Sequence, residues 1–280
     1  MAICKTDVIE KLKAKSVEIK KDIIKLAAHA KEGHCASAMS ISDIMTALYF
    51  HRMKYDPQNP EWEDRDRFIL SKGHASQVLY VCLYHAGFFG LEKLHTFLQK
   101  DTGLAGHPIR GGAPGVEAST GSLGQGFSVS IGIALGARLL KKDFHTFAII
   151  GDGESNEGIV WEGALAAAHY GLDNLTVFLD RNNYQCDGYS NNVMRLDPID
   201  EKWRSFGWEV RVCDGHDMEQ LVNLVDQVPF AKGKPSLILG HTIKGKGVDF
   251  MENRAEWHYR APNDQEMAKA IEQLDSSCYL

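Results

Sequence analysis

The sequence lacks closely spaced cysteines, although its 280 residues include six of them. No two form a Cys-x-x-Cys pair, so neither a zinc site nor a disulfide framework is indicated. This pattern suits a reducing cytoplasm, where thiols stay free. The six are Cys4, Cys35, Cys82, Cys186, Cys213 and Cys278.

The sequence also lacks an apolar run that approaches the roughly 20 residues needed to span a bilayer. Its first residues, MAICKTDVIEKLKAKS, are charged and amphipathic, unlike a signal peptide. The net charge of −6 argues against a general affinity for nucleic acid or for anionic membranes. We therefore expect a cytoplasmic protein that binds small molecules.

Apolar residues make up 44% of the chain, which is enough for a substantial core. Short, continuously apolar runs alternate with helical patterns, which predicts strands buried on both faces. We expect an α/β fold, a parallel sheet flanked by helices, as one domain over residues 1–280. It would include a helical segment over about 1–55, with Ser40 and Ser42 as helix caps, and a short helix over about 263–275. The main expected strands lie at 146–151, 175–181, 209–215 and 236–243, and an earlier one lies in RFILSKGHASQVLYVCLYHAGF.

The stretch AIIGDGESNEG places a carboxylate, Asp152, inside a glycine turn between a strand and a helix. Turns of this kind usually bind phosphate, which an isolated carboxylate would repel. Asn182 follows the next expected strand, and parallel neighbours end at the same edge of a sheet. Carboxylate and amide oxygens suit Mg²⁺ or Ca²⁺, which in turn accept diphosphate oxygens as ligands. The pair therefore predicts a divalent metal that holds a diphosphate, beside the positive end of a helix that begins near Glu157.

Two other interpretations of this turn stay open at this point. Asp152 alone could simply cap a helix, although the paired Asn182 favours the metal site. A nicotinamide fingerprint needs Gly or Ala at its sixth position, where this sequence has Asn156, and an unpaired Asp152 would oppose the pyrophosphate.

Five of the twelve histidines directly follow a glycine, a pairing that suits a polar cleft. Any one of them alone is more often a partly buried structural residue. For His216, in DGHD, we expect such a structural role, and His241 has no supporting motif. In TIKGKG, Lys244 and Lys246 either meet a phosphate or are solvated. The five are His34, His74, His107, His216 and His241.

The segment GDGESNEGIVWEGALAAAHYGLDNLTVFLDRNN resembles the thiamine diphosphate motif, which opens with Gly-Asp-Gly and closes with Asn, and it is most similar to the transketolase form. The similarity extends from about residue 15 to 262. Further stretches match in the transketolase order: EGHCASAMS with His34, RDRFILSKGHA with His74, GHPIRGGAPGVEASTGSLGQG with His107, and EWHYRAP with His258.

The resemblance implies the thiamine diphosphate-binding fold, with Mg²⁺ held by Asp152, Asn182 and the main-chain carbonyl of Tyr184. It places Gly153 and His74 beside the diphosphate. A loop of Gly121, Ser122 and Leu123 would reach toward the aminopyrimidine ring of the cofactor.

The resemblance also implies catalytic roles. His34 and His258 are candidates to remove the proton of the donor hydroxyl, and His107 would hold the donor ketose. Glu157 and Glu162 match acidic positions that link paired active sites across a dimer interface.

Some residues depart from the family pattern. Cys35 and Ser122 stand where the family often has Pro, and HYRAP replaces a common His-Gly-x-Pro. These departures predict an altered donor pocket.

Transketolases normally continue into a second, pyrimidine-binding domain and a third domain, whereas this chain ends at Leu280. We therefore expect a separate C-terminal subunit, with two copies of each chain in the complex. The expected reaction moves a two-carbon ketol unit from a ketose, as sugar or sugar phosphate, to an aldose. The alternatives are the α subunit of a 2-oxo acid dehydrogenase, a relative of deoxyxylulose phosphate synthase, and a non-catalytic cofactor-binding partner.

Overall fold

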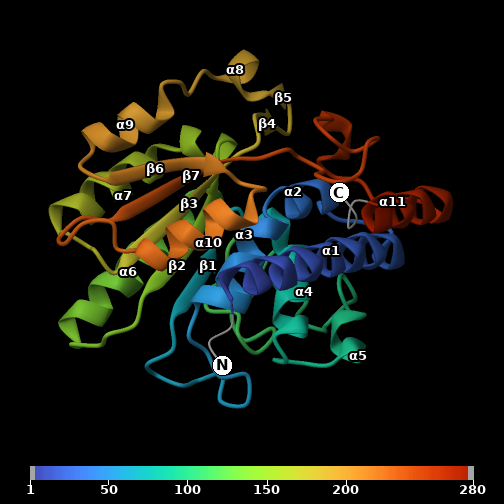
Figure 1. The fold of residues 1–280 in the computed structure, drawn as a ribbon, viewed down its shortest axis with the longest axis horizontal. Coiled ribbons are helices and arrows are strands. Elements are labelled where there is room, and N and C mark those ends of the chain that lie inside the picture. Colours follow the sequence, from blue (N-terminus) through green and yellow to red (C-terminus); the bar gives the residue numbers. More distant parts are fainter. Residues whose placement is uncertain (1–3, 277–280) are drawn as a thin grey trace.

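The structure is a computed structural model and describes residues 4–276. A five-stranded parallel sheet lies between two layers of helices (Figure 1), which confirms the predicted α/β fold. The strand order is β1-β2-β3-β7-β6. The strands are β1 (Arg67–Leu70), β2 (Thr146–Gly151), β3 (Leu175–Arg181), β6 (Glu209–Asp214) and β7 (Ser236–His241).

The central strands are buried on both faces because the sheet has a hydrophobic core on each side. On β2, Phe147 and Ile149 belong to one core, whereas Ala148 and Ile150 belong to the other. Successive side chains of a strand point to opposite faces, so a strand between two cores has to be apolar at every position. This explains the continuous apolar runs in the sequence.

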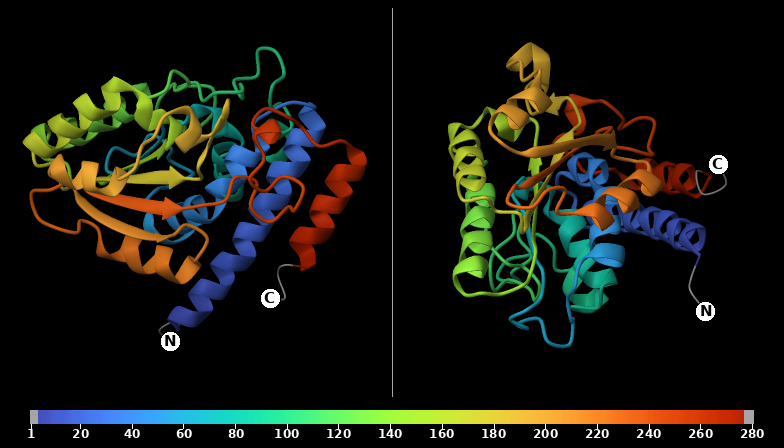
Figure 2. Two further views of the ribbon diagram at one scale, coloured as in Figure 1. Left: turned by 90° about the horizontal axis from the view of Figure 1, so that it is seen from above. Right: turned by 60° about the vertical axis from the view of Figure 1, so that its left-hand side comes forward.

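Each core is closed by its own set of helices, and the two sets are well separated in Figure 2. The first core lies under α1 (Lys5–Ala30), α2 (Cys35–Ser40), α3 (Ser42–Ala47), α4 (Ser76–His85), α5 (Leu91–Leu94), α10 (Met218–Gln227) and α11 (Asp264–Ser276). The second lies under α6 (Gln125–Leu139), α7 (Gly158–His169) and α9 (Ile199–Ser205).

The predicted helical segment near the amino terminus is present, but its second helix is divided. The chain breaks between α2 and α3 at Ile41 and then forms a π-helical turn over Leu48–Arg52. The expectation that Ser40 and Ser42 cap this helix is wrong. Their hydroxyls instead donate to the carbonyls of Ser37 and Met39 within the preceding turn, so neither accepts a bond from a helix N–H group.

The chain also contains short elements that the sequence did not predict. A 3₁₀ turn over Gly153–Asn156 separates β2 from α7. A small antiparallel hairpin of β4 (Tyr184–Gln185) and β5 (Gly188–Tyr189) follows β3 and leads into α8 (Ser190–Val193). The predicted C-terminal helix is confirmed as α11.

The glycine-rich stretch before α6 is irregular because two of its backbone segments touch. A Cβ atom on Gly103 would lie 2.4 Å from the carbonyl oxygen of Gly112, and Gly103 has a φ of +81°. Only glycine satisfies both conditions, since it has no Cβ and tolerates positive φ.

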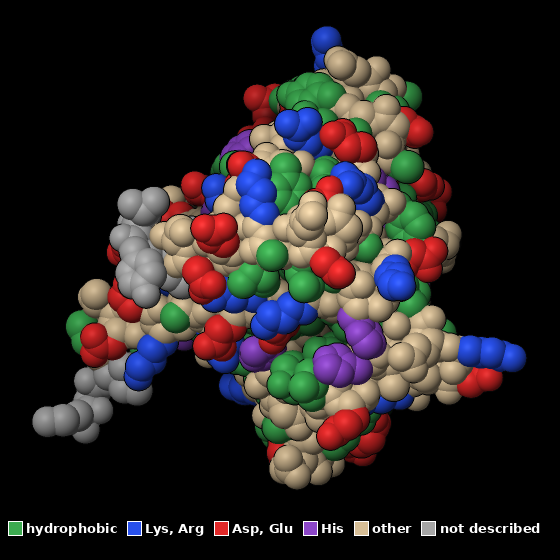
Figure 3. Space-filling model, turned by 90° about the vertical axis from the view of Figure 1, so that its right-hand side faces the viewer, with side chains coloured by type: hydrophobic (Ala, Val, Ile, Leu, Met, Phe, Trp, Pro, Cys, Tyr) green, Lys and Arg blue, Asp and Glu red, His purple; other side chains and the backbone are tan. Residues whose placement is uncertain are grey.

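On the face of the molecule shown in Figure 3, acidic and basic side chains are interspersed. Within residues 4–276, none of the helices combines the length and the apolar character required to cross a membrane. The five cysteines in this range are free thiols, and Cys278 lies outside the described residues.

Candidate functional site

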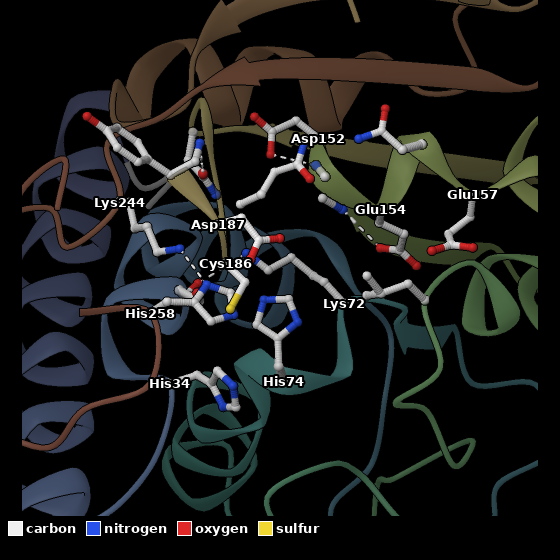
Figure 4. Close-up of a pocket in the computed structure, with 18 of the residues that line it drawn as sticks. His34, Lys72, His74, Asp152, Glu154, Glu157, Cys186, Asp187, Lys244 and His258 are labelled. Carbon is white, nitrogen blue, oxygen red and sulfur yellow. Dashed lines mark hydrogen bonds between the residues drawn. The ribbon is translucent and has the colours of Figure 1, made fainter. Parts of the chain in front are cut away.

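A cavity of about 430 Å³ lies at the carboxyl ends of β1, β2, β3 and β7, and Figure 4 shows its side chains. It brings together most of the predicted site residues, although they come from distant parts of the sequence. Those that line it are His34, His74, His107, Gly121, Leu123, Asp152, Gly153, Glu157, Asn182, Tyr184 and His258.

Two predicted residues do not line this cavity. Ser122 is exposed, although its neighbours Gly121 and Leu123 do line the cavity. Glu162 is exposed on α7, one turn beyond the cavity-lining Glu157. The structure therefore places Glu162 on the outer surface of a helix and not beside the other catalytic candidates.

Asp152 directly follows β2, and it is only 1% exposed. Its Oδ1 accepts the main-chain N–H of Gly153 at 2.7 Å, and its Oδ2 accepts that of Asn183 at 2.8 Å. The Arg181 guanidinium also donates to Oδ2, at 3.3 Å. Burial and the charge of Asp180 nevertheless raise the pKa of Asp152, so the carboxylate is short of positive charge.

Asn182 directly follows β3, which pairs in parallel with β2. Its Nδ2 donates to Asp180 Oδ2 at 2.7 Å, and its Oδ1 accepts the N–H of Tyr184 at 2.9 Å. These two bonds hold the amide in one orientation. The expectation that Asp152 and Asn182 follow neighbouring strands and meet in one crevice is confirmed.

The oxygen donors at this edge fit a hard divalent cation. Within residues 4–276, no group of three or more His, Cys, Asp and Glu side chains could hold a metal by itself. An ion beside Asp152 would therefore need the amide oxygen of Asn182, the carbonyl of Tyr184 and ligand oxygens to complete its shell. A site with one carboxylate suits a metal that arrives with a diphosphate. Asp152 also caps the 3₁₀ turn through its bond to Gly153, so the capping that the sequence left open is observed.

Across the cavity from Asp152, Figure 4 shows His34, His74 and His258, and His107 lines the same cavity. The ring centroid of His34 lies 5.2 Å from that of His74, 6.0 Å from that of His107 and 5.2 Å from that of His258. Their backbones belong to segments that are far apart in sequence, and an isolated β-bridge between His34 and Arg260 joins two of these segments.

All four histidines are held in the neutral form. Burial lowers the pKa of His34 to about 4 and that of His258 to about 3, and nearby Lys244 and Lys72 lower both further. Burial also lowers the pKa of His74 and of His107. A neutral imidazole has one nitrogen that donates and one that accepts, so this cluster can bind sugar hydroxyls and exchange protons with them.

The geometry agrees with a family match that covers nearly the whole chain. Residues 12–277 match the family described as transketolase, thiamine diphosphate binding domain. The chain belongs to this family.

Curated relatives in the family include separate subunits of similar length. A 6-deoxy-6-sulfo-D-fructose transketolase subunit from Clostridium is 42% identical over 243 residues, which are 87% of this chain and 88% of the relative. An apulose-4-phosphate transketolase subunit from Phocaeicola vulgatus is 38% identical over 266 residues, which are 95% of this chain and 94% of the relative.

Among solved structures, a transketolase from Leishmania mexicana superposes with a TM-score of 0.90 at 29% identity. The match covers 95% of this chain but 41% of the Leishmania chain. The chain thus spans less than half the length of that transketolase, and the thiamine diphosphate-binding fold expected from the sequence is confirmed.

The transketolase site includes charged residues that sequence reasoning missed. Lys72 is buried at the end of β1, and its Nζ lies 2.5 Å from Asp180 Oδ2. Lys72 stands one residue before the Gly-His pair of His74, so its position beyond a strand end was a usable signal. Glu154, in the Gly-Asp-Gly segment, accepts the N–H of Gly124 at 2.7 Å and that of Gly151 at 3.0 Å. It therefore joins the entry of α6 to the end of β2.

The remaining Gly-His pairs lie apart from this cavity. His216 Nδ1 lies 2.7 Å from Asp43 Oδ2, and its Nε2 accepts the N–H of Ile243 at 2.8 Å. Lys20 on α1 binds the same carboxylate, which belongs to α3. His216 therefore links the β6–α10 turn to these two helices and has the expected structural role. His241 is exposed at the end of β7.

The two lysines of TIKGKG differ in burial and in their position relative to the cavity. Lys244 is buried against the cavity, whereas Lys246 is partly exposed and does not line it.

Proposed function

We propose that this chain is the cofactor-binding subunit of a two-chain transketolase, which moves a two-carbon ketol unit from a ketose donor to an aldose acceptor. The observation that carries the proposal is the single cavity with Asp152 and Asn182 on one side and four neutral histidines on the other. One side suits a metal-bound diphosphate, and the other suits a polyhydroxylated substrate.

In this proposal, Mg²⁺ is held by Asp152, Asn182 and the carbonyl of Tyr184, and Ca²⁺ is the alternative ion. Gly153 and His74 would contact the diphosphate, and Gly121 and Leu123 would approach the pyrimidine ring. Thiamine diphosphate, when bound, supplies the carbon nucleophile for cleavage and formation of the carbon–carbon bond. The chain's own residues orient the cofactor and the sugar and transfer protons.

The histidines divide this work according to where they lie. His34 stands at the centre of the cluster, within ring contact of the other three. His34 and His258 are the candidates to take the proton of the donor hydroxyl, and His107 would hold the donor. His107 is exposed, whereas the other three histidines are half-buried, so a donor sugar can reach it from outside.

The partner would be a separate pyrimidine-binding chain, because the two relatives above are named as subunits and the match covers less than half of the longer transketolase. The outer surface formed by α6, α7 and the turns that follow them supports a subunit contact. It carries exposed apolar side chains, and Glu162 lies on the same surface. These side chains are Val129, Leu139, Leu140, Leu165 and Tyr170.

We further propose an assembly of two copies of each subunit in the cytoplasm, where the free cysteines would stay reduced. The relatives are named for a sulfonated ketose and for a ketose phosphate, so a ketose with an anionic group is the first donor to assay.

The deciding experiment combines the chain with its partner subunit, thiamine diphosphate, Mg²⁺, a ketose phosphate and an aldose acceptor. We expect ketol transfer by the complex and none by either chain alone. Release of CO₂ from a 2-oxo acid without ketose cleavage would support the dehydrogenase alternative instead. Formation of a complex that is inactive on both substrate classes would indicate a non-catalytic cofactor-binding role.

A further inference from the structure

The ammonium group of Lys244 is buried beside the cavity with a histidine as its hydrogen-bond partner. Lys244 is 1% exposed, and its Nζ lies 2.7 Å from Nδ1 of His258. Among the described residues, the Lys244 side chain makes no other hydrogen bond. A lysine ammonium has three donors and no acceptor, so Nδ1 of His258 has to accept the bond.

This bond determines which nitrogen of His258 carries the proton. A neutral imidazole has one N–H group, and the other nitrogen accepts. Burial and the charge of Lys244 keep the pKa of His258 near 3, so the ring is neutral around pH 7. With Nδ1 as acceptor, the proton resides on Nε2, and the free edge of the ring presents a donor.

His34 is in the opposite situation. It packs edge-on against His258, with the ring planes at 90°, yet neither of its ring nitrogens has a hydrogen-bond partner among the described residues. Its ring is also neutral, because burial lowers its pKa to about 4. Either nitrogen of His34 can therefore act as an acceptor toward a ligand in the cavity.

We propose that Lys244 is a positioning residue that fixes His258 as the Nε2–H tautomer, so that His258 donates a hydrogen bond to the donor sugar while His34 accepts the proton of its hydroxyl. In this step the O–H bond breaks, an N–H bond forms on His34, and the electron pair stays on the sugar oxygen. The Nε2–H of His258 stabilises that oxygen. The inference rests on the proposed function and separates the roles of two histidines that sequence similarity treats alike.

Lys244 is protonated near pH 7, because its pKa, although lowered, lies above that value. Burial and the charge of Lys72 lower its pKa to about 8, while Asp180, Asp152 and the Cys186 thiol act in the opposite direction. Lys72 itself is paired with Asp180. His34 and His74 face His258 from the other side of the cluster. The tautomer should therefore be fixed at neutral pH and become mixed as the pH rises through about 8.

The test is a nitrogen-15 NMR measurement on the full chain, labelled at histidine, at pH 7. The long-range imidazole correlations distinguish the Nε2–H from the Nδ1–H form, and the spectrum of a His258→Gln variant assigns the signals. We expect the Nε2–H form for His258 in the native chain and in Lys244→Arg, which also has only donors. Lys244→Met should give a mixture. Lys246→Met is the matched control in the same loop, and it should leave the spectrum unchanged.

An Nδ1–H form in the native chain, or an unchanged His258 spectrum in Lys244→Met, overturns the proposal. The native spectrum alone decides this if Lys244→Met fails to fold. In the complex with the partner, Lys244→Met should lower kcat about tenfold or more with a smaller effect on KM, and Lys244→Arg should restore part of the loss. If ketol transfer is never found but the tautomer is as expected, the proposed function fails and the Lys244–His258 assignment stands.

Discussion

The ammonium of Lys72 and the carboxylate of Asp180 form a fully buried ion pair at the base of the cofactor cavity, with Nζ 2.5 Å from Oδ2. Ser40 and Asn182 bind the same carboxylate, so the pair connects α2, the end of β1 and the end of β3. Burial alone raises the pKa of Asp180, but Lys72 and the hydroxyl groups of Thr242 and Ser40 reverse the effect and lower it. Asp180 therefore stays ionised because of its partners.

Removing one member of this pair should destabilise the fold. We expect Lys72→Met to lower the free energy of unfolding by about 3 to 5 kcal/mol, because Asp180 would remain buried without its counter-ion. Urea denaturation followed by circular dichroism measures this. Lys100→Met, at an exposed position, is the control and should change stability by less than about 0.5 kcal/mol. An equally small effect at Lys72 would show that the pair does not support the fold.

The proposed metal site should depend on Asp152. We expect Asp152→Ala to weaken binding of thiamine diphosphate in the presence of Mg²⁺ by about 100-fold, since it removes the charged member of the ligand set. Calorimetric titration with and without Mg²⁺ measures the effect. Asp101→Asn removes an exposed carboxylate and should bind as the native chain does. Cofactor affinity that is the same in Asp152→Ala and in the native chain would refute the site.

Glu162 should act on assembly and not on the cofactor. Because it lies exposed on α7 and outside the cavity, we expect Glu162→Ala to weaken the association between the two subunits by about tenfold, or about 1.4 kcal/mol. Its cofactor affinity should stay at the native level. Sedimentation with the partner chain and cofactor titration measure the two effects, with Glu201→Ala on α9 as an exposed acidic control. Equal losses in both would argue against this separation of roles.

Acid should destabilise the protein through its buried histidines. Burial lowers the pKa of His145 to about 3, whereas an unfolded histidine has a pKa near 6.5. Between these values the unfolded chain binds more protons, so stability is lost as the pH falls from about 6.5 toward 3. The slope is up to about 1.4 kcal/mol per pH unit for this residue. His34 and His258 contribute in the same direction.

A single substitution tests this assignment. His145→Gln can keep a bond to the Thr176 hydroxyl, which lies 2.8 Å from the ring, but does not titrate in this range. Its free energy of unfolding should depend less steeply on pH between 6 and 4 than that of the native chain. Urea denaturation at several pH values measures this, and the exposed His169→Gln should keep the native slope. Identical slopes for native and His145→Gln would contradict the assignment.

Much of the fold could be predicted from the sequence because it is expressed in local patterns. The run TFAIIG was long and apolar enough to identify β2 to the residue, and the buried strand β3 followed in the same way. The break of the second helix at Ile41 could not be predicted. Beside the break, the Ser40 hydroxyl bonds within its own turn and also contacts Asp180, a residue far away in sequence.

The sequence by itself determined the parallel sheet and the position of Asp152 and Asn182 at one edge of it, because strand burial is a local pattern and crossover direction follows a general rule. The pairing of β2 with β3, which brings the two residues together, was decided by the tertiary structure. The four motif histidines were also identified, through resemblance. Only the tertiary structure decided that Lys72 pairs with Asp180 and that Lys244 bonds to His258. Contacts of this kind leave no periodic pattern in the sequence, because they form between segments that only the fold brings together. Inside a low-dielectric cavity, each buried charge then requires a specific partner.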